Sequence, residues 1–313
     1  MNLDIVIVNW QSGNLLENCV SSIRAADNSF VSQIVIVDNA SSDDSLQRLK
    51  PEGLPIKILR NSVNVGFGRA CNIGASVCGA PFILFLNPDC EVRPDSLKVA
   101  LQFMLDPTND RVGICGVQLR DQKGVVSRTC AHFPTFSRFA AEIFGLNKIR
   151  GLKSLGVHMS SWDHQCTRQV NHVIGAYFLV RRNVFRELDG FDERFFVYLE
   201  DLDFSIRASS KGWMSVYLTS TYAYHEGGGT SKKVMARRLF YSTRSRILYS
   251  FKHFSPIPAW ILLGLTIFIE PIMRIVYAIM RRNTSGIAET LSGYRMLFKD
   301  LRTILSRQRL ISK

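Results

Sequence analysis

The sequence predicts an α/β domain whose mainly parallel sheet is flanked by helices, followed by a basic and apolar helical segment. Short β-branched runs recur along the first part of the chain, and helical patterns lie between them. The distribution of charged residues distinguishes the second part of the chain from the first. Residues 1–230 hold 23 lysines and arginines against 23 aspartates and glutamates, whereas residues 231–313 hold 16 against 3. The formal net charge of +13 therefore lies entirely in the last 83 residues.

The expected strands begin with four runs, at residues 3–10, 32–41, 56–61 and 81–89. Helical patterns separate the first two runs and the last two, which is the order of βαβ units in a parallel sheet. Further strands are expected at 112–120, at the start of 170–185, where a helix opens at Asn183, and at 215–224. The mixed stretch 137–162 is expected to form a lid or loop that faces the acceptor.

The apolar run within residues 255–282 follows a basic stretch, and this combination favours an anionic membrane surface as the partner. Its cleanest part, 257–269, has 13 residues before Glu270 and Pro271. A spanning helix needs about 20 apolar residues. We therefore expect an interfacial or re-entrant pair of helices, with a full span as the alternative. Nucleic-acid binding is not expected, because the sequence contains no nucleic-acid motif.

The seven cysteines are scattered and form no CxxC pair. This pattern argues against a disulfide framework and a zinc site, so the thiols are expected to be reduced and mostly in the core. Asp4 interrupts the first apolar stretch, and no basic residue precedes it. We expect no signal peptide and a cytoplasmic catalytic body.

Polar residues follow each of the four expected strands, and the carboxyl ends of parallel strands meet at one crevice. A glycine-containing turn then leads into a helix within residues 64–80, although close helix packing explains its glycines equally well. Arg69 and Asn72 follow this turn at helical spacing. The residues that follow the strands are Asn9, Asp38, Asn39, Arg60, Asn61, Asn87 and Asp89.

Two motifs place carboxylates where catalysis is expected. Asp89 ends the run at residues 81–89, and one carboxylate there can hold Mg²⁺ or Mn²⁺ when phosphates and waters complete the site. An Asx turn is the structural alternative. Asp201 follows Glu200 and several aromatic residues that can desolvate it, as a general base near neutral pH requires. The alternative is an ordinary amphipathic helix with an acidic first turn.

His225 precedes the glycines at 227–229, which allow a close approach of the backbone to a phosphate. It is a candidate second metal or diphosphate contact, against a purely structural role. His158 and His172 lack such neighbours, and we expect both to be structural.

The chain contains, in this order, the segments IVIVNW, IVIVDNASSD, NVGFGRACNIG, FLNPDC, GAYFLVRR, GFDERFFVYLEDLDFSIRASSKGW and HEGGGTS. Together these segments resemble the family 2 inverting glycosyltransferases of the GT-A fold. The resemblance is to their bacterial rhamnosyltransferase-like branch and covers about residues 3–231. It implies a catalytic domain at 1–230, with a nucleotide-sugar half at about 1–110 and an acceptor half at 111–230. The tail at 231–313 lies outside the resemblance, and its basic and apolar pattern predicts membrane association.

The resemblance also implies roles for individual residues. Asp38 is expected to contact the nucleobase and Asp89 to hold Mg²⁺ or Mn²⁺ together with His225. Asp201 is the implied catalytic base, with Glu200 beside it. The chain has Asn87–Pro88–Asp89 where the family has two aspartates, so weak metal binding assisted by the substrate is expected. The residues expected to line the nucleotide-sugar site are Asn9, Asp38, Asn39, Asn64, Gly66, Arg69 and Asn87.

The activity implied is inverting transfer of L-rhamnose from deoxythymidine-diphosphate rhamnose to a polyprenyl diphosphate-linked sugar. It would serve O-antigen or cell-wall polysaccharide synthesis, with a peripheral or monotopic enzyme at the cytoplasmic face of the bacterial inner membrane. One alternative keeps the chemistry with galactose, glucose or galactofuranose as the donor sugar. Another is a non-catalytic, membrane-bound nucleotide-binding protein.

Overall fold

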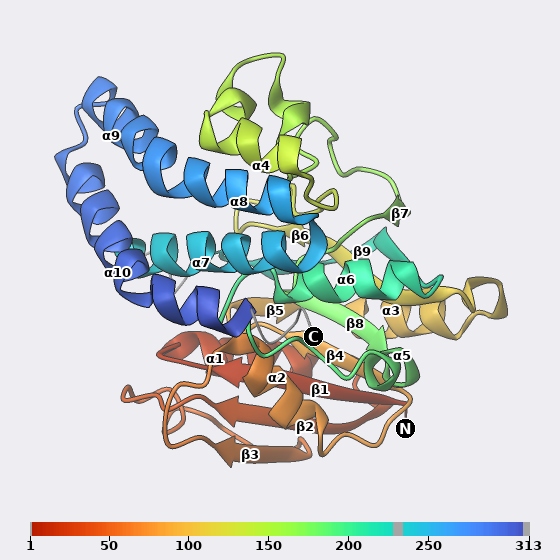
Figure 1. Cartoon of the computed structure of the whole chain (residues 1–313). Coiled ribbons are helices and arrows are strands. Elements are labelled where there is room, and N and C mark those ends of the chain that lie inside the picture. Colours follow the sequence, from red (N-terminus) through yellow and green to blue (C-terminus); the bar gives the residue numbers. More distant parts are fainter. Residues whose placement is uncertain (1, 228–233, 309–313) are drawn as a thin grey trace. The chain divides into compact units, whose positions relative to one another are not determined.

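The computed structural model describes residues 2–227 and 234–308 and divides into two compact units (Figure 1). The first unit comprises Met1–His132, Trp162–Glu193 and Glu200–Thr230. The second comprises Phe133–Ser161, Arg194–Leu199 and Ser231–Lys313. Nearly all of the stretch 137–162 thus belongs to the second unit, and its expected role as a lid stays a prediction.

The first unit is built on a mixed sheet. Its strand order is β3-β2-β1-β4-β8-β6-β9-β5, and β7 pairs with β9. The four runs expected first are all strands and run parallel to one another: β1 (Leu3–Asn9), β2 (Val31–Asp38), β3 (Ile56–Arg60) and β4 (Phe82–Leu86). The others are β5 (Cys90–Val92), β6 (Val112–Arg120), β7 (Arg168–Val170), β8 (Tyr177–Arg181) and β9 (Met214–His225).

The α/β class is confirmed, and the sheet is parallel only in its first half. Strand β8 runs antiparallel to both β4 and β6, while β5 and β7 run antiparallel to β9. Strands β6 and β9 are parallel to each other. An antiparallel strand next to β4 brings the start of β8 to the edge of the sheet where β4 ends.

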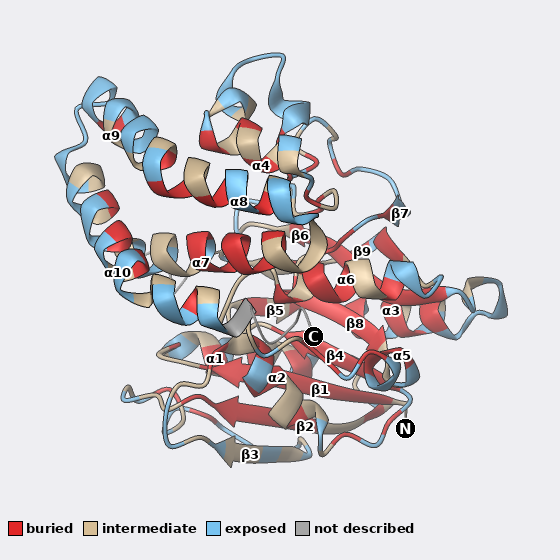
Figure 2. Cartoon of the chain, in the orientation of Figure 1, coloured by how far each residue is buried: buried red, intermediate tan, exposed pale blue. Residues whose placement is uncertain are grey.

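Helices cover both faces of the sheet in the first unit. The aliphatic side chains of β1 alternate: Ile5 and Ile7 pack with α1 (Asn14–Ala25) and α3 (Ser96–Leu105). Val6 faces α2 (Phe67–Ala75), where a Cβ on Gly74 would lie 2.4 Å from its Cγ1. Figure 2 shows β1 and β4 buried in this sheet, whereas β3 at its edge is partly exposed.

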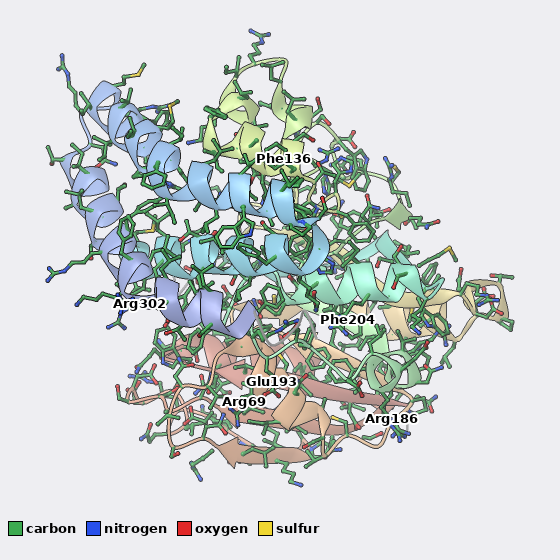
Figure 3. The ribbon with its side chains drawn as sticks, in the orientation of Figure 1. Arg69, Phe136, Arg186, Glu193, Phe204 and Arg302 are labelled. Atoms are coloured by element: carbon green, nitrogen blue, oxygen red, sulfur yellow. The ribbon has the colours of Figure 1, made fainter. Side chains whose placement is uncertain are left out.

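A cluster of aromatic rings fixes α6 (Glu200–Ser210) in the first unit. Phe204 of α6, labelled in Figure 3, lies with its ring centroid 5.8 Å from Phe178, 5.5 Å from Phe185 and 5.3 Å from Phe191. Phe185 belongs to α5 (Arg182–Glu187) and Phe178 to β8. Aromatic pairs at such separations favour one another beyond the burial of their area. The start of α6, which carries Glu200 and Asp201, is therefore anchored.

The second unit is helical. Its helices are α4 (Phe136–Ile143), α7 (Met235–His253), α8 (Pro256–Gly264), α9 (Glu270–Met280) and α10 (Thr284–Gln308). Helix α10 packs against α7 and α9, and α4 packs against α8. Phe139 of α4 meets Tyr249 of α7 edge to face, with ring centroids 5.8 Å apart.

The apolar run of the tail forms one continuous helical path and not a pair of helices broken at Glu270 and Pro271. A π-helical turn, Leu265–Ile269, joins α8 to α9. Pro271 has no N–H and its ring would clash with the carbonyl four residues earlier, and the wider π turn in front of it accommodates both. Glu270 stays buried because it pairs with Arg246 and Arg274. By length and composition, the helical path Pro256–Met280 is sufficient to cross a membrane. A spanning helix and a helix that lies along the membrane surface therefore both stay predictions.

The cysteines behave as expected. Cys19, Cys71, Cys78, Cys90, Cys115 and Cys130 are buried free thiols, and Cys166 is exposed. Burial raises the pKa of Cys115 to about 12, which keeps its thiol protonated.

Candidate active site

The carboxyl ends of β1 and β2 carry a buried polar pair. Asn9 and Asp38 are aligned in the register of the two strands, and the Nδ2 of Asn9 donates to the Oδ1 of Asp38 at 2.8 Å. The same amide group donates to Ser45 Oγ at 2.9 Å. The hydrogen bonds fix the orientation of the Asp38 carboxylate, which is 5% exposed. Asn9 thus supports Asp38 from within the sheet.

A second network joins the end of β2 to the start of α2. The Nδ2 of Asn39 donates to Asn64 Oδ1 at 2.9 Å and to the carbonyl of Gly66 at 3.2 Å. The Oδ1 of Asn39 in turn accepts from the backbone N–H of Val65 at 3.0 Å. Gly66 has a φ of 90°, a conformation that favours glycine, and α2 begins at the next residue. The glycine turn expected from the sequence is therefore built by Asn39 and Asn64.

Arg69 and Asn72, both on α2, contact the loop that leads toward α6. Figure 3 labels Arg69 and Glu193, whose Nε and Oε2 atoms lie 3.5 Å apart. Asn72 is used structurally: its Nδ2 donates to the carbonyl of Phe191 at 2.8 Å, and its Oδ1 accepts from the N–H of Phe191 at 2.9 Å. Arg69 remains the solvent-facing cation of this helix, because its side chain is 56% exposed.

Asp89 and His225 form the candidate metal site. The Nε2 of His225 lies 3.3 Å from the Oδ1 of Asp89, and both side chains are about nine-tenths buried. Pairing of β5 with β9 produces this contact, because Cys90 lies opposite His225 and the Glu226 N–H donates to the Asp89 carbonyl at 3.2 Å. Gly228 and Gly229, expected to help at this turn, lie outside the described residues.

Cys90 completes a three-residue group with ligand atoms within 4.8 Å of one another. The Cys90 thiol is not the kind of ligand that Mg²⁺ or Mn²⁺ prefers. Burial raises the pKa of Cys90 well above its ordinary value, and its Sγ donates to the carbonyl of Ala176 at 3.3 Å. An oxygen and an imidazole nitrogen thus remain, which suits Mg²⁺ or Mn²⁺ only when substrate phosphates and water add further ligands.

Asp201 has a fixed carboxylate at the start of α6. Its Oδ2 accepts from the backbone N–H of Gly175 at 2.7 Å, and its Oδ1 accepts from the N–H of Leu202 at 2.8 Å. A Cβ on Gly175 would lie 3.0 Å from Oδ2, so only glycine allows this approach without displacement. His172 Nε2 lies 3.6 Å from the same oxygen, and His172 Nδ1 lies 3.2 Å from Ser205 Oγ.

Glu200 is the more deeply buried of the two adjacent acids. Glu200 is 4% exposed and packs against α2. A Cβ added to Gly68 of α2 would lie 3.5 Å from the Cβ of Glu200. Its Oε2 has no hydrogen-bond partner within the described parts of the chain. Burial raises the pKa of Glu200 well above its ordinary value, and the neighbouring Asp201 carboxylate raises it further. Both effects favour the protonated form of Glu200 beside Asp201.

Residues 175 and 176 link the two carboxylate motifs. The Gly175 N–H binds Asp201, while the Ala176 carbonyl accepts from the Asn87 N–H at 2.9 Å, two residues before Asp89. Strand β1 reaches the same edge, since Ile7 is aligned with Leu86 and Asn9 follows two residues later. The structure thus brings Asn9, Asn87, Asp89 and Asp201 to one edge of the sheet within the first unit.

Two features of this site were not predicted from the sequence. His172 was expected to be structural, and its contact with the Asp201 carboxylate was not foreseen. Gly175 was not singled out, and only its position before a strand could have indicated a close backbone approach.

The pH dependence of stability tests the environment of Glu200. Because its folded-state pKa is raised, the stability contributed by protonated Glu200 is full below its ordinary pKa of about 4.3 and is lost as the pH rises through the raised pKa. We expect Glu200→Gln to remove this loss, so that its melting temperature falls less than that of the parent between acid and neutral pH. Thermal unfolding across pH measures this. Glu52→Gln, at an exposed site, is the control, and parallel curves for Glu200→Gln and the parent would refute the assignment.

The family model for glycosyl transferase family 2 matches residues 4–189, more than half of the chain. The chain therefore belongs to glycosyl transferase family 2, and it is a glycosyltransferase. This confirms the family expected from the motifs.

Two relatives narrow the comparison. The N-acetylglucosaminyl-diphospho-decaprenol L-rhamnosyltransferase of Mycobacterium tuberculosis is 28% identical over 261 residues, covering 79% of this chain and 83% of the relative. The rhamnosyltransferase WbbL of Escherichia coli K12 is 23% identical over 254 residues, covering 78% and 91%. Rhamnosyltransferases are thus among the proteins to which this chain is similar.

Solved structures share the fold. The mannosyltransferase PcManGT from Pyrobaculum calidifontis, solved with GDP-Man and Mn²⁺, superposes with a TM-score of 0.56 at 14% identity. The match covers 96% of this chain and 87% of that one. The structure of S. aureus TarS 1-349 with UDP-GlcNAc gives 0.54 at 16% identity, covering 97% and 92%. At these identities the comparison bears on the fold, and it confirms the expected GT-A architecture.

Proposed function

We propose that this glycosyltransferase moves L-rhamnose from a nucleoside-diphosphate donor, deoxythymidine-diphosphate rhamnose, to a polyprenyl diphosphate-linked sugar. The contact chain Asp201–Gly175–Ala176–Asn87 carries the proposal, because it fixes one carboxylate beside the strand end that bears Asp89. A base next to a diphosphate-binding edge is the arrangement that glycosyl transfer from a nucleotide sugar needs. The two rhamnosyltransferase relatives support the choice of sugar.

Asp201 acts as the general base of a single displacement. As the acceptor hydroxyl oxygen forms its bond to the anomeric carbon, Asp201 takes the hydroxyl proton and the bond to the nucleoside diphosphate breaks. The attack comes from the face opposite the leaving group, so the anomeric configuration inverts. The N–H groups of Gly175 and Leu202 hold the carboxylate in one orientation throughout. The raised pKa of Glu200 favours a single negative charge at this position.

Asp89 and His225 would hold a divalent cation, Mg²⁺ or Mn²⁺. When bound, such an ion offsets the negative charge that develops on the leaving diphosphate. Asp89 is the only carboxylate of the Asn87–Pro88–Asp89 segment, so most ligands must come from the donor phosphates and water. We therefore expect metal affinity to rise when the donor is present.

The strand ends would bind the nucleoside. Asp38, oriented by Asn9, accepts hydrogen bonds from the nucleobase, and the network of Asn39, Asn64 and Gly66 shapes the turn before α2. Arg69 is exposed on the same helix and can reach an anionic group. Asn87, which directly follows β4, completes the donor-facing edge.

The helical unit would hold the enzyme at an anionic membrane, at the cytoplasmic face of the bacterial inner membrane. Along α8 and α9 large apolar side chains are exposed at helical intervals, and α9 is followed by Arg281 and Arg282. A helix with an apolar face and flanking cations binds the headgroup region of anionic bilayers. An acceptor carried on a polyprenyl lipid would be met there.

Turnover with a panel of nucleotide sugars tests the proposed function. The acceptor is polyprenyl diphosphate N-acetylglucosamine, and the measured product is the released nucleoside diphosphate. We expect deoxythymidine-diphosphate rhamnose to give the highest kcat/KM. A preference for a galactose, glucose or galactofuranose donor would change the sugar and keep the mechanism. No release from any donor would favour a non-catalytic nucleotide-binding protein and refute the proposal.

A further inference from the structure

Residues 144–155 directly follow α4 in the second unit. They expose an unusual combination of side chains. Every residue from Lys148 to Leu155 is exposed. The aliphatic and aromatic members alternate with three cations, and no acidic residue occurs between Glu142 and Asp163. The exposed apolar members are Phe144 at 40%, Leu146 at 36%, Ile149 at 50%, Leu152 at 38% and Leu155 at 41%, and the cations are Lys148, Arg150 and Lys153.

The segment has a defined conformation, so its exposed apolar groups do not result from missing structure. It contains two 3-10 turns, Leu146–Lys148 and Lys153–Leu155. At its base the Arg138 guanidinium donates to the carbonyls of Ser154 at 2.9 Å and Gly156 at 2.6 Å. Glu142 Oε1 accepts from the N–H of Val157 at 2.9 Å. A segment that is already ordered loses less conformational entropy when it binds.

The segment adjoins the exposed apolar stripe of α8 and α9 within the same unit. The Lys148 Nζ lies 4.2 Å from the centroid of the Tyr277 ring on α9, and α4 packs against α8. Together the segment and the stripe form what we call the apolar-basic face. The exposed members of the stripe are Ile257, Trp260, Ile261, Phe268, Ile272, Met273, Val276, Tyr277, Ile279 and Met280.

We propose that residues 144–155 are a second lipid-binding element, which inserts its apolar side chains into an anionic bilayer beside α9. This inference rests on the membrane association proposed above for the helical unit. A contiguous exposed apolar patch marks an interaction site. Charges of a single sign around aliphatic tips complement the negative headgroups of a bilayer, whereas a protein partner would need a matching acidic surface. Lys148, Arg150 and Lys153 supply this charge.

Sedimentation of the full chain with phosphatidylcholine vesicles, with and without phosphatidylglycerol, tests the proposal. We expect the triple variant Ile149→Asp, Leu152→Asp, Leu155→Asp to bind phosphatidylglycerol vesicles at least about tenfold more weakly than the parent. The variant Lys148→Gln, Arg150→Gln, Lys153→Gln should lose most of the preference for phosphatidylglycerol. All six side chains are exposed, so the fold should tolerate these changes. Val125→Asp, at an exposed apolar residue of the first unit, is the matched control.

A tryptophan introduced at the tip gives an independent readout. The fluorescence of Leu152→Trp should shift to shorter wavelength when phosphatidylglycerol vesicles are added, and unchanged emission would overturn the insertion.

The outcomes separate this inference from the proposed function. If the aspartate variant of residues 144–155 binds vesicles as the parent does while Ile272→Asp, Val276→Asp on α9 does not, the second element is refuted and the membrane role of the helices stands. If the parent itself fails to bind vesicles, both are refuted. If the aspartate variant changes only self-association, measured by analytical ultracentrifugation, a second copy of the chain and not a lipid covers this face, which also overturns the proposal.

Discussion

Replacing Asp201 by Asn is expected to lower kcat by about 10²- to 10⁴-fold, the contribution of a positioned general base. The amide keeps the shape of the carboxylate and can still accept the hydrogen bond from Gly175 N–H, but it cannot take the acceptor proton. Donor affinity should change little, because the proposed nucleotide site lies at the strand ends around Asp38. Nucleoside-diphosphate release measures kcat, and isothermal titration measures donor affinity.

Two results would count against this role of Asp201. Parental turnover in Asp201→Asn would show that another group takes the proton. A loss of turnover together with a collapse of the melting temperature would show that the residue supports the fold. Glu52→Gln removes an exposed carboxylate from the loop before β3 and should leave both kcat and stability unchanged.

The second large effect is expected at the metal site. Asp89→Asn should lower kcat by about 10²-fold at the metal concentration that saturates the parent, because the only carboxylate of this segment is lost. It should also shift the dependence of turnover on Mn²⁺ or Mg²⁺ to higher concentration. His225→Gln is expected to give the same shift with a smaller loss, since imidazole is the weaker partner for these cations. Titration of activity with each metal after chelation measures both.

Cys90→Ala provides the matched control for this site, since Cys90 belongs to the same cluster but holds a protonated thiol. Its metal dependence should equal that of the parent, while its melting temperature falls because a buried side chain is lost. A shift in metal dependence for Cys90→Ala alone would make the thiol the ligand. Full activity of Asp89→Asn after chelation would exclude the proposed metal site.

The position of much of the candidate nucleotide-sugar site could be predicted because parallel strands end at one edge of a sheet. Asn9, Asp38 and Asp89 each follow an apolar run in the sequence. The structure places Asn9 and Asp38 at the ends of β1 and β2 and Asp89 in the turn between β4 and β5. The order of strands in the second half of the sheet could not be predicted. It depends on β8 lying antiparallel between β4 and β6, which is a matter of packing and not of local pattern.

The surroundings of the base illustrate the same limit. The motif that contains Asp201 predicts a carboxylate at a helix start, but its partners Gly175 and His172 are distant in sequence. The sequence also predicted a break at Glu270 and Pro271, where the chain remains helical. Arg246 of α7 pairs with Glu270 there, and no pattern within the apolar run reports a partner from another helix.

The anomeric configuration of the product tests the central claim most directly. Nuclear magnetic resonance of the sugar transferred by the parent enzyme, compared with that of the nucleotide-sugar donor, reads the stereochemistry of one turnover. Direct attack by an acceptor oxygen that Asp201 deprotonates predicts complete inversion. A product with the donor's configuration would require two displacements or attack from the same face, and would contradict the assignment of Asp201 as the base of a single displacement.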